Sequence, residues 1–240
     1  MRPDSFYQRM WDVYQKSPPT EKRDWLHRMI LDRIFDPRAN NRSTVALRQL
    51  GGGHRLLDIG CWDGGFAVLA QEQGLFPEVY GIDLIEDAVA IARKRGVTAY
   101  VADLNTEPLP FEAEFFDAVT MLAVLEHVFD PYFAVAEAHR VLKPGGEFIV
   151  AVPNVASASN RLRILRGRIP ITSIDSGWDG GHLHYFTPYD LTRLLTESGF
   201  NVVARNATGG RPGLREWWLS LLSGEFVVKA IRGSASSCNV

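Results

Sequence analysis

Short apolar segments alternate with amphipathic helical segments from residue 55 to residue 154, and this alternation constrains the possible folds more than any other feature. Strands that are connected through helices pair in parallel, with right-handed crossovers. The strand segments are apolar along most of their length, which is typical of a sheet covered on both faces. We therefore expect an α/β fold with a mostly parallel sheet between two layers of helices.

Seven segments have the length and composition of strands. The predicted strands are residues 55–59, 79–82, 99–102, 116–121, 147–152, 200–205 and 226–231. The predicted helices are residues 65–73, 86–95, 131–142 and a helix that opens at Thr187 and ends near Gly199. Thr187 is suited to cap its helix, because Pro188 and Asp190 follow it in the first turn. Residues 143–146 read Lys-Pro-Gly-Gly and predict a turn.

The chain divides into an N-terminal extension, a main domain and a short tail. Residues 1–50 are predicted to form a helical extension or lid, and the glycine run at 51–53 is interpreted as a hinge. Residues 51–232 form the expected main domain, with an insertion at about 155–187. Residues 233–240 are small and polar, which is typical of a disordered tail.

The composition argues against several functions. A net charge of −2 provides no overall positive field for nucleic acid or for an anionic membrane. No apolar run reaches the ~20 residues of a membrane helix, and no apolar core follows a basic start as in a signal peptide. The two cysteines, Cys61 and Cys238, do not form a disulfide framework. We therefore expect a cytoplasmic protein with no integral membrane segment and no nucleic-acid partner.

A glycine-rich turn follows the first predicted strand, at the sheet edge where open α/β folds bind their ligands. The turn contains Gly60, Gly64 and Gly65, and glycine lets a ligand approach the backbone closely. The second and third strands end at Asp83 and Asp103. An acid about 20 residues after such a turn can accept hydrogen bonds from ribose hydroxyls.

Trp62 argues against a nicotinamide dinucleotide as the ligand. Gly60 and Gly65 have the outer spacing of a dinucleotide fingerprint, but Trp62 replaces the middle glycine. A pyrophosphate requires close approach to the backbone at that glycine, which an indole obstructs. A nicotinamide-dependent oxidoreductase is therefore a disfavoured alternative.

Residues 55–154 resemble the core of class I S-adenosylmethionine (SAM)-dependent methyltransferases, through the glycine turn, the two strand-end acids and motifs at 116–119 and 140–146. The resemblance implies a Rossmann-like seven-stranded sheet whose last strand is antiparallel, with SAM as cofactor and S-adenosylhomocysteine as product. It assigns the amino-acid part of SAM to Gly60, Gly64 and carbonyls near Leu122, the ribose to Asp83, and the adenine to Leu84, Asp103 and Leu104. Asp58, Cys61 and Trp62 belong to the same turn and complete the expected cofactor site.

Three shorter segments resemble more specific groups of proteins, and these resemblances favour different subfamilies. Residues 124–128, Val-Leu-Glu-His-Val, are similar to quinone-type O-methyltransferases, some of which bind a divalent metal through this Glu, this His and an acid three residues before the Glu. Ala123 occupies that first position, so we expect no metal. Residues 153–154 and 160–172 resemble the MetW proteins linked to methionine biosynthesis. Residues 181–188 are more similar to sugar and secondary-metabolite methyltransferases.

Three histidines could act as the base that assists an oxygen acceptor, because histidine titrates near neutral pH. They are His127, His182 and His184. His182 and His184 would share a face if the chain is extended there, whereas His127 could instead hydrogen-bond the backbone of its loop. The other candidate acceptor contacts are Tyr7, Trp11, Tyr14, Asn154, Arg161, Tyr185 and Trp217.

Several of these contacts have structural alternatives. The aromatic residues before position 15 could form a lid that excludes water, or they could pack an ordinary helix. Arg161 belongs to an arginine cluster that could bind an anionic substrate group or form a solvated helix face. Trp217 could line an acceptor pocket, a homodimer contact or an edge that touches a membrane.

These patterns favour a SAM-dependent methyltransferase acting on a small-molecule acceptor, with a hydroxyl oxygen as the favoured atom. One alternative is an N-methyltransferase of a small amine. Another is a MetW-like protein that binds SAM and acts through a partner, with little activity of its own. The fold hosts many chemistries, so the acceptor is not identified by the sequence.

Overall fold

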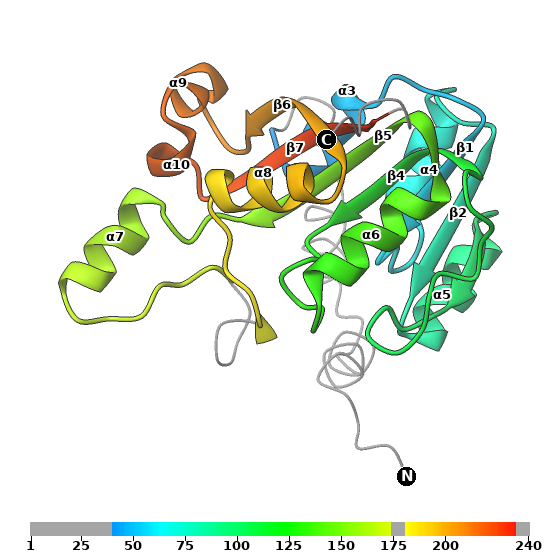
Figure 1. Ribbon diagram of the computed structural model, residues 1–240, viewed down its shortest axis with the longest axis horizontal. Helices are drawn as coiled ribbons and strands as arrows, with labels where there is room; N and C mark the ends of the chain where they lie inside the picture. Colours follow the sequence, from blue (N-terminus) through cyan, green and yellow to red (C-terminus); the bar gives the residue numbers. More distant parts are fainter. Residues whose placement is uncertain (1–39, 174–180, 234–240) are drawn as a thin grey trace, which may run out of the picture.

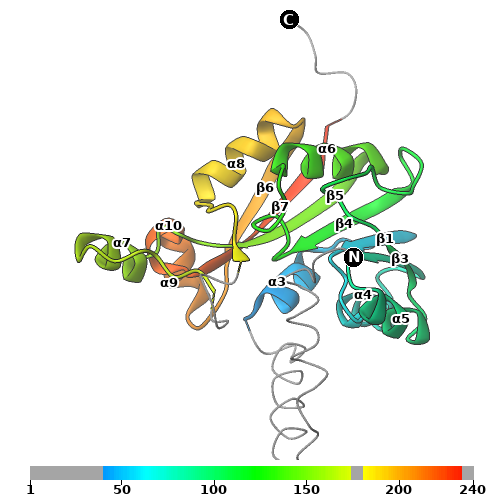
Figure 2. The same cartoon turned by 90° about the horizontal axis from the view of Figure 1, so that it is seen from below.

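The computed structural model describes residues 40–173 and 181–233 of the 240-residue chain, and one seven-stranded sheet forms its centre. The strands are β1 (Arg55–Ile59), β2 (Glu78–Asp83), β3 (Thr98–Val101), β4 (Phe116–Leu122), β5 (Leu142–Pro153), β6 (Phe200–Ala207) and β7 (Glu225–Arg232). Their order is β3-β2-β1-β4-β5-β7-β6, and β7 runs antiparallel to both of its neighbours (Figures 1 and 2). The predicted mostly parallel sheet with an antiparallel last strand is confirmed.

Helices cover both faces of the sheet. They are α3 (Arg42–Gln49), α4 (Gly65–Glu72), α5 (Glu86–Lys94), α6 (Pro131–Val141), α7 (Ala158–Leu165), α8 (Pro188–Glu197), α9 (Pro212–Trp217) and α10 (Leu219–Leu222). Helices α6 and α8 lie on one face, whereas α3, α4 and α5 lie on the other (Figure 2). Phe148 and Ile149 are neighbours on β5 and belong to opposite apolar layers, because side chains alternate along a strand.

Helix α8 begins where the sequence predicts. The Thr187 hydroxyl accepts a hydrogen bond from the Asp190 backbone N–H at 3.2 Å and donates one to the Asp190 carboxylate at 2.6 Å. This local exchange satisfies an N–H group that the first turn of a helix leaves unpaired. Pro188 occupies the first turn, where its missing N–H has no cost.

Helix α3 packs onto the sheet, with Val45, Leu47 and Leu50 buried in the same apolar layer as α4 and α5. The glycine run that follows is held in place, because the Gly51 N–H donates to Oε2 of Glu147 at 2.7 Å. The remainder of the predicted extension, including the aromatic residues at positions 7, 11 and 14, lies outside the described residues.

Strand β5 begins earlier than the sequence indicates. Leu142 already pairs with Phe116, and the register then shifts before Glu147 pairs with Ala118. Gly145 lies within this shift at φ +77°, in the region that favours glycine. The predicted turn at 143–146 is therefore an irregular opening segment of β5.

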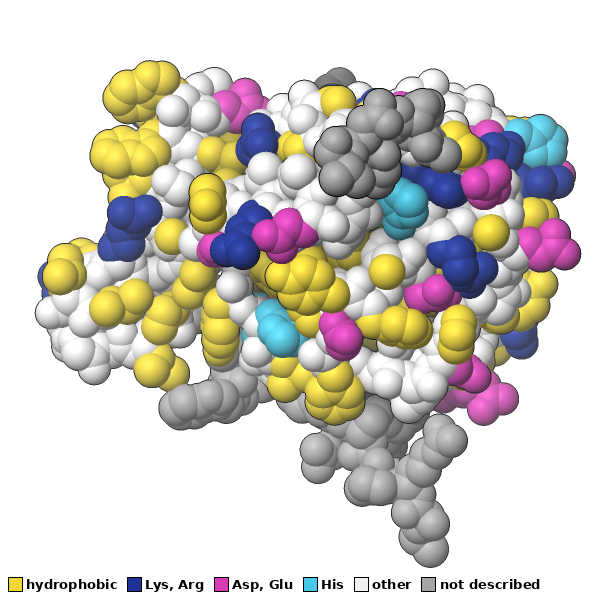
Figure 3. All heavy atoms as spheres, viewed as in Figure 1, with side chains coloured by type: hydrophobic (Ala, Val, Ile, Leu, Met, Phe, Trp, Pro, Cys, Tyr) yellow, Lys and Arg dark blue, Asp and Glu magenta, His cyan; other side chains and the backbone are white. Residues whose placement is uncertain are grey.

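The insertion after β5 contains α7 and returns to the sheet at Phe186, which forms a bridge with Asn154. Two short helices between β6 and β7, α9 and α10, were not predicted. Exposed apolar side chains gather over α7 and α9, on the left of Figure 3, and include Leu165 and Trp217. None of the helices in residues 40–173 and 181–233 combines the length and apolarity that a bilayer span requires.

Candidate functional site

The glycine turn between β1 and α4 follows a path that side chains would obstruct. Gly60 and Gly64 have φ angles of +73° and +78°, in the left-handed region. A Cβ atom at Gly60 would overlap Cγ2 of Val124, in the loop after β4. A Cβ atom at Gly64 would lie 2.9 Å from Cγ2 of Val97 and 3.0 Å from Cβ of Ala92. The two glycines therefore let the turn pack tightly against the loop after β4 and against α5.

Trp62 is accommodated without disrupting this turn. Its backbone is left-handed, with φ +50°, and its N–H donates to Oδ2 of Asp83 at 2.9 Å. The half-buried indole packs against Ile85 and Ala88 at the start of α5. The side chain that replaces the middle glycine of the fingerprint therefore stabilises the start of α5.

Asp83 ends β2 and connects two parts of the sheet edge. Its Oδ2 accepts from Trp62, and its Oδ1 accepts from the backbone N–H of Ile85 at 3.0 Å. Burial raises the pKa of Asp83, while these backbone hydrogen bonds favour the ionised form. Each carboxylate oxygen can accept more than one hydrogen bond, so Asp83 retains capacity for ribose hydroxyls.

Asp58 lies inside the sheet on β1. Its Oδ1 accepts a hydrogen bond of 2.6 Å from the hydroxyl of Thr120 on β4. Burial raises the pKa of Asp58 to about 7; the Thr120 hydrogen bond opposes this shift and the nearby charge of Asp83 adds to it. Asp58 is therefore a buried titratable group behind the glycine turn, on the predicted cofactor side.

The remaining predicted cofactor residues differ in exposure. Leu84 is 40% exposed, so its side chain presents apolar surface, whereas Leu104 is buried in the main core. Leu122 is half-buried at the end of β4. Cys61 is buried so closely against β2 that a Cβ atom at Gly81 would lie 2.5 Å from its sulfur. Burial also raises the pKa of the Cys61 thiol, which disfavours the nucleophilic thiolate.

Asp103 connects the end of β3 with the loop after β4. Its Oδ1 accepts hydrogen bonds of 2.9 Å from both the backbone N–H and the side-chain amide of Asn105. Oδ1 of Asn105 in turn accepts from the Phe129 N–H at 2.7 Å. The second strand-end acid, Asp103, therefore lies at the same edge as the loop that carries His127.

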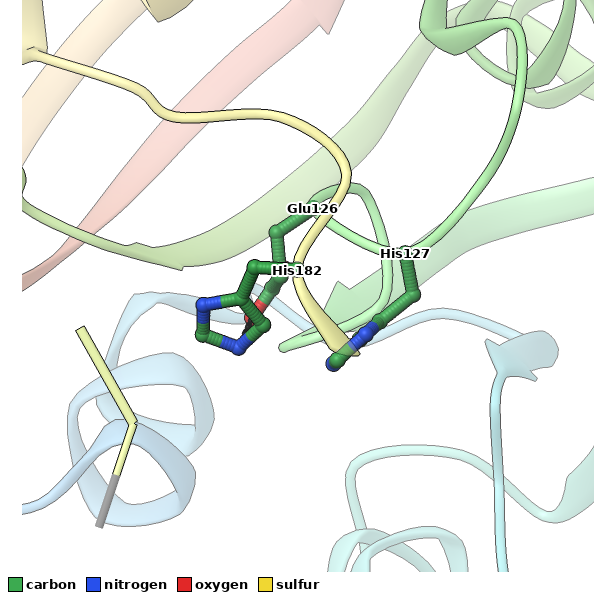
Figure 4. A group of neighbouring side chains, drawn as sticks. All are labelled: Glu126, His127 and His182. Carbon is green, nitrogen blue, oxygen red and sulfur yellow. Dashed lines mark ion pairs between the residues drawn. The ribbon is translucent and has the colours of Figure 1, made fainter. Parts of the chain in front are cut away.

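A buried carboxylate and two imidazoles meet beyond the end of β4 (Figure 4). Glu126 is only 1% exposed, and burial raises its pKa to about 8. Nε2 of His182 lies 4.0 Å from Oε1 of Glu126, and the ring centroids of His127 and His182 are 4.7 Å apart. We call Glu126, His127 and His182 the carboxylate–imidazole cluster; one potential ligand atom from each lies within 4.8 Å of the others.

His184 has a different setting from His182. The backbone carbonyl of Glu126 accepts hydrogen bonds from the N–H groups of Leu183 and His184, at 2.8 and 3.1 Å, which holds this segment against the β4 loop. The ring of His184 lies with Nε2 3.2 Å from the carbonyl oxygen of Phe129. Of the three candidate bases, the structure therefore brings together His127 and His182.

The model of the family described as "Methyltransferase domain" matches residues 14–205, which is well over half of the chain. The chain belongs to the methyltransferase domain family. The match includes the glycine turn, both strand-end acids and the carboxylate–imidazole cluster, so the resemblance seen in the sequence is confirmed.

Curated relatives include two proteins described as "Ubiquinone biosynthesis O-methyltransferase". The protein of Dinoroseobacter shibae is 30% identical over 187 residues, which cover 75% of this chain and 74% of that protein. The protein of Ruegeria pomeroyi is 29% identical over 236 residues, which cover 92% of this chain and 90% of that protein.

Solved structures share the fold. An S-adenosylmethionine-dependent methyltransferase from Mesorhizobium loti is 25% identical with a TM-score of 0.58, and the alignment covers 80% of this chain and 98% of that chain. A possible histamine N-methyltransferase from Thermotoga maritima is 22% identical with a TM-score of 0.62, with coverage of 88% and 96%.

This methyltransferase is SAM-dependent, and the geometry of its sheet edge fits that cofactor. Asp83, predicted to bind the ribose, has carboxylate oxygens with capacity for further hydrogen bonds, and Leu84, predicted to contact adenine, is 40% exposed. The carboxyl groups of Asp58 and Asp83 suit a cofactor that carries a positive sulfonium and an ammonium group.

The predicted acceptor residues of the methyltransferase do not all face one space. Asn154 is 1% exposed, and its amide donates to the carbonyls of Ser223 and Ser220 at 2.7 and 3.0 Å, so it holds the chain around α10. Arg161 donates to the Ala156 carbonyl at 2.7 Å on the surface of α7. Trp217 is 79% exposed on α9.

Glu126 was predicted only as part of a motif, and neither Thr120 nor Thr172 was predicted as a site residue. Glu126 could have been identified from the sequence, because an acid inside the apolar segment that follows β4 is expected to be buried and to require a partner. Thr120 and Thr172 carry no such signal, since their partners Asp58 and His182 come from other elements.

Proposed function

We propose that this methyltransferase methylates a hydroxyl oxygen of a small molecule. The observation that carries the proposal is the position of the carboxylate–imidazole cluster. Two of its members, Glu126 and His127, lie two and three residues after Val124, the residue whose side chain packs at Gly60 of the glycine turn. Groups that can accept a proton therefore lie beside the turn expected to hold the methyl donor. The relatives described as O-methyltransferases support the same acceptor atom.

Bound SAM supplies an electrophilic methyl group on its sulfonium. The task of the protein is to hold the acceptor oxygen in line with that methyl, and such positioning can contribute up to ~7–11 kcal/mol in ideal cases. The hydroxyl proton has to leave as the new O–C bond forms, and assistance from a base typically contributes ~10²–10⁴-fold. His127 and His182 are the residues assigned to this proton.

The acceptor is assigned to a site beside the cluster. Tyr185 is 45% exposed in the segment that follows His184, and it is assigned to the wall of this acceptor site. The arginines of α7, represented by Arg161, are assigned to any anionic group of the acceptor. The N-terminal aromatic residues are assigned to a lid that excludes water from the reaction.

The test is product analysis with ¹³C-methyl SAM and a panel that pairs phenols and catechols with amines of similar size. O-methylated products are expected, and their formation should fall in His127→Ala and His182→Ala. N-methylated products alone would establish the amine alternative. SAM binding without transfer, together with capture of a stable enzyme partner, would establish the MetW-like alternative.

A further inference from the structure

Glu126 is the most poorly compensated polar side chain in the described part of the chain. It is buried, and neither carboxylate oxygen has a hydrogen-bond partner among residues 40–173 and 181–233. Burying a carboxylate without a partner is costly, so native proteins supply a hydrogen bond, a counter-charge or a metal ion. The side chain points toward His182 and His127 (Figure 4).

Outer groups orient both imidazoles of the cluster. Nδ1 of His182 lies 2.6 Å from the hydroxyl of Thr172, and this contact directs Nε2 toward Glu126. Nδ1 of His127 lies 3.4 Å from the carbonyl oxygen of Gly181. Histidines that bind metals usually bond through their second ring nitrogen to an outer carbonyl, carboxylate or water, which fixes the ring and its tautomer.

We propose that Glu126, His127 and His182 bind a divalent transition-metal cation of the Zn²⁺ type. Three protein ligands that leave one position for substrate are the usual pattern of catalytic zinc sites. Metal–ligand bonds of about 2.0–2.2 Å place tetrahedral ligand atoms about 3.4 Å apart. The ligand atoms here lie within 4.8 Å of one another, so a modest inward movement of the side chains completes the site.

His182 changes which cation the site prefers. The quinone-type pattern requires an acid at position 123, whereas this chain has Ala123, which contributes no ligand atom. The third ligand comes instead from the far side of the insertion and supplies nitrogen. Two imidazoles and one carboxylate favour Zn²⁺, Co²⁺ or Fe²⁺, whereas sites built from oxygen atoms favour Mg²⁺ or Ca²⁺. The local motif at 123–127 indicated no metal because it does not include His182.

The catalytic role of the cation rests on the proposed function. Binding of the cation to the cluster is independent of that function. A cation held by these three residues would lower the pKa of a hydroxyl bound at its open position, so that the hydroxyl proton would pass to water. The oxygen would then form the O–C bond as the S–C bond of the sulfonium breaks, which leaves S-adenosylhomocysteine. With the cation bound, His127 and His182 would serve as metal ligands in place of the proton acceptors assigned above, and the metal would activate the hydroxyl.

The test is titration of chelator-treated full-length protein with Co²⁺, followed by its visible absorption, and with Zn²⁺ by calorimetry. We expect one cation per chain, with affinity lowered at least ~10–100-fold in His182→Ala and in the conservative Glu126→Gln. His54→Ala is the matched control, because this exposed histidine lies beside Glu78. The His54→Ala variant should bind the cation with the affinity of the wild type.

Two outcomes would overturn the proposal. One is the absence of stoichiometric binding to the folded wild type. The other is binding that persists in both cluster variants. Binding of S-adenosylhomocysteine by each variant verifies that its fold is intact. The measurement uses no methyl acceptor, so failure of the hydroxyl-acceptor proposal and failure of the metal proposal are separate results.

Discussion

The backbone N–H of Trp62 donates a hydrogen bond of 2.9 Å to Oδ2 of Asp83, which ties the glycine turn after β1 to the end of β2. The other oxygen of Asp83 accepts from Ile85, at the start of α5. One carboxylate therefore connects the glycine turn to the start of α5, and it is the group that we predict binds the ribose.

Asp83→Ala should weaken SAM binding by about 10–100-fold. Hydrogen bonds to a charged group contribute about 1.5–3 kcal/mol, and each 1.4 kcal/mol corresponds to a factor of ten in affinity. Calorimetric titration with SAM and S-adenosylhomocysteine measures the effect. Glu86→Ala, an exposed change in the first turn of α5, is the control and should bind normally. Unchanged affinity in Asp83→Ala would refute the cofactor assignment.

Gly60→Ala should destabilise the protein by about 2–4 kcal/mol, because the new methyl group overlaps Val124 in addition to straining a left-handed residue. Gly74→Ala isolates the backbone strain. Gly74 has a similar φ of +72°, but nothing lies within 4 Å of its added Cβ, so about 1 kcal/mol is expected. Urea denaturation compares the two variants, and equal losses would contradict the packing described for Gly60. Val124→Ala in the Gly60→Ala background should restore part of the loss.

Asp58 should make stability depend on pH. Its folded pKa of about 7 lies above its ordinary value, so between about pH 4 and about pH 7 the folded state binds more protons than the unfolded state. The contribution of this group to the free energy of unfolding therefore decreases as pH rises through that range, by up to ~4 kcal/mol. Asp58→Asn removes the titration, so its stability relative to the wild type should increase from about pH 4 to about pH 8. Urea denaturation across the range tests this, and a constant difference would exclude the shift.

Asn154→Ala should lower the free energy of unfolding and leave SAM affinity unchanged. The variant leaves the carbonyls of the part-buried Ser220 and the buried Ser223 without this donor, at a cost of about 2–3 kcal/mol. Asn201→Ala, an exposed change on β6, should cost no more than ~0.5 kcal/mol. Thermal denaturation and SAM titration together distinguish this role from contact with the acceptor. If SAM affinity fell while stability stayed unchanged, the structural role assigned to Asn154 would be wrong.

Local patterns were sufficient for most of the fold. The predicted and observed limits of β1 agree at both ends, and the cap at Thr187 is present, because both depend on residues close together in the chain. The start of β5 was missed because residues 143–146 combine turn-forming residues with strand pairing to β4. Helix α9 was missed because its short sequence has no apolar periodicity, and Trp217 was interpreted as a residue of a pocket or a contact surface.

The sequence by itself determined the alternating α/β order, the glycine turn and the strand-end acids, since parallel strands place their carboxyl ends at one edge whatever the details of packing. Only the tertiary structure decided which distant side chains meet there. His182 lies beside Glu126 because the insertion returns to the end of β4. The Asn154 amide donates to carbonyls at α10 and its end, so it is engaged within the protein. Leu104 belongs to the core although its neighbouring motif predicted a ligand contact. Such contacts depend on chain paths that hydrophobic periodicity and residue spacing do not encode.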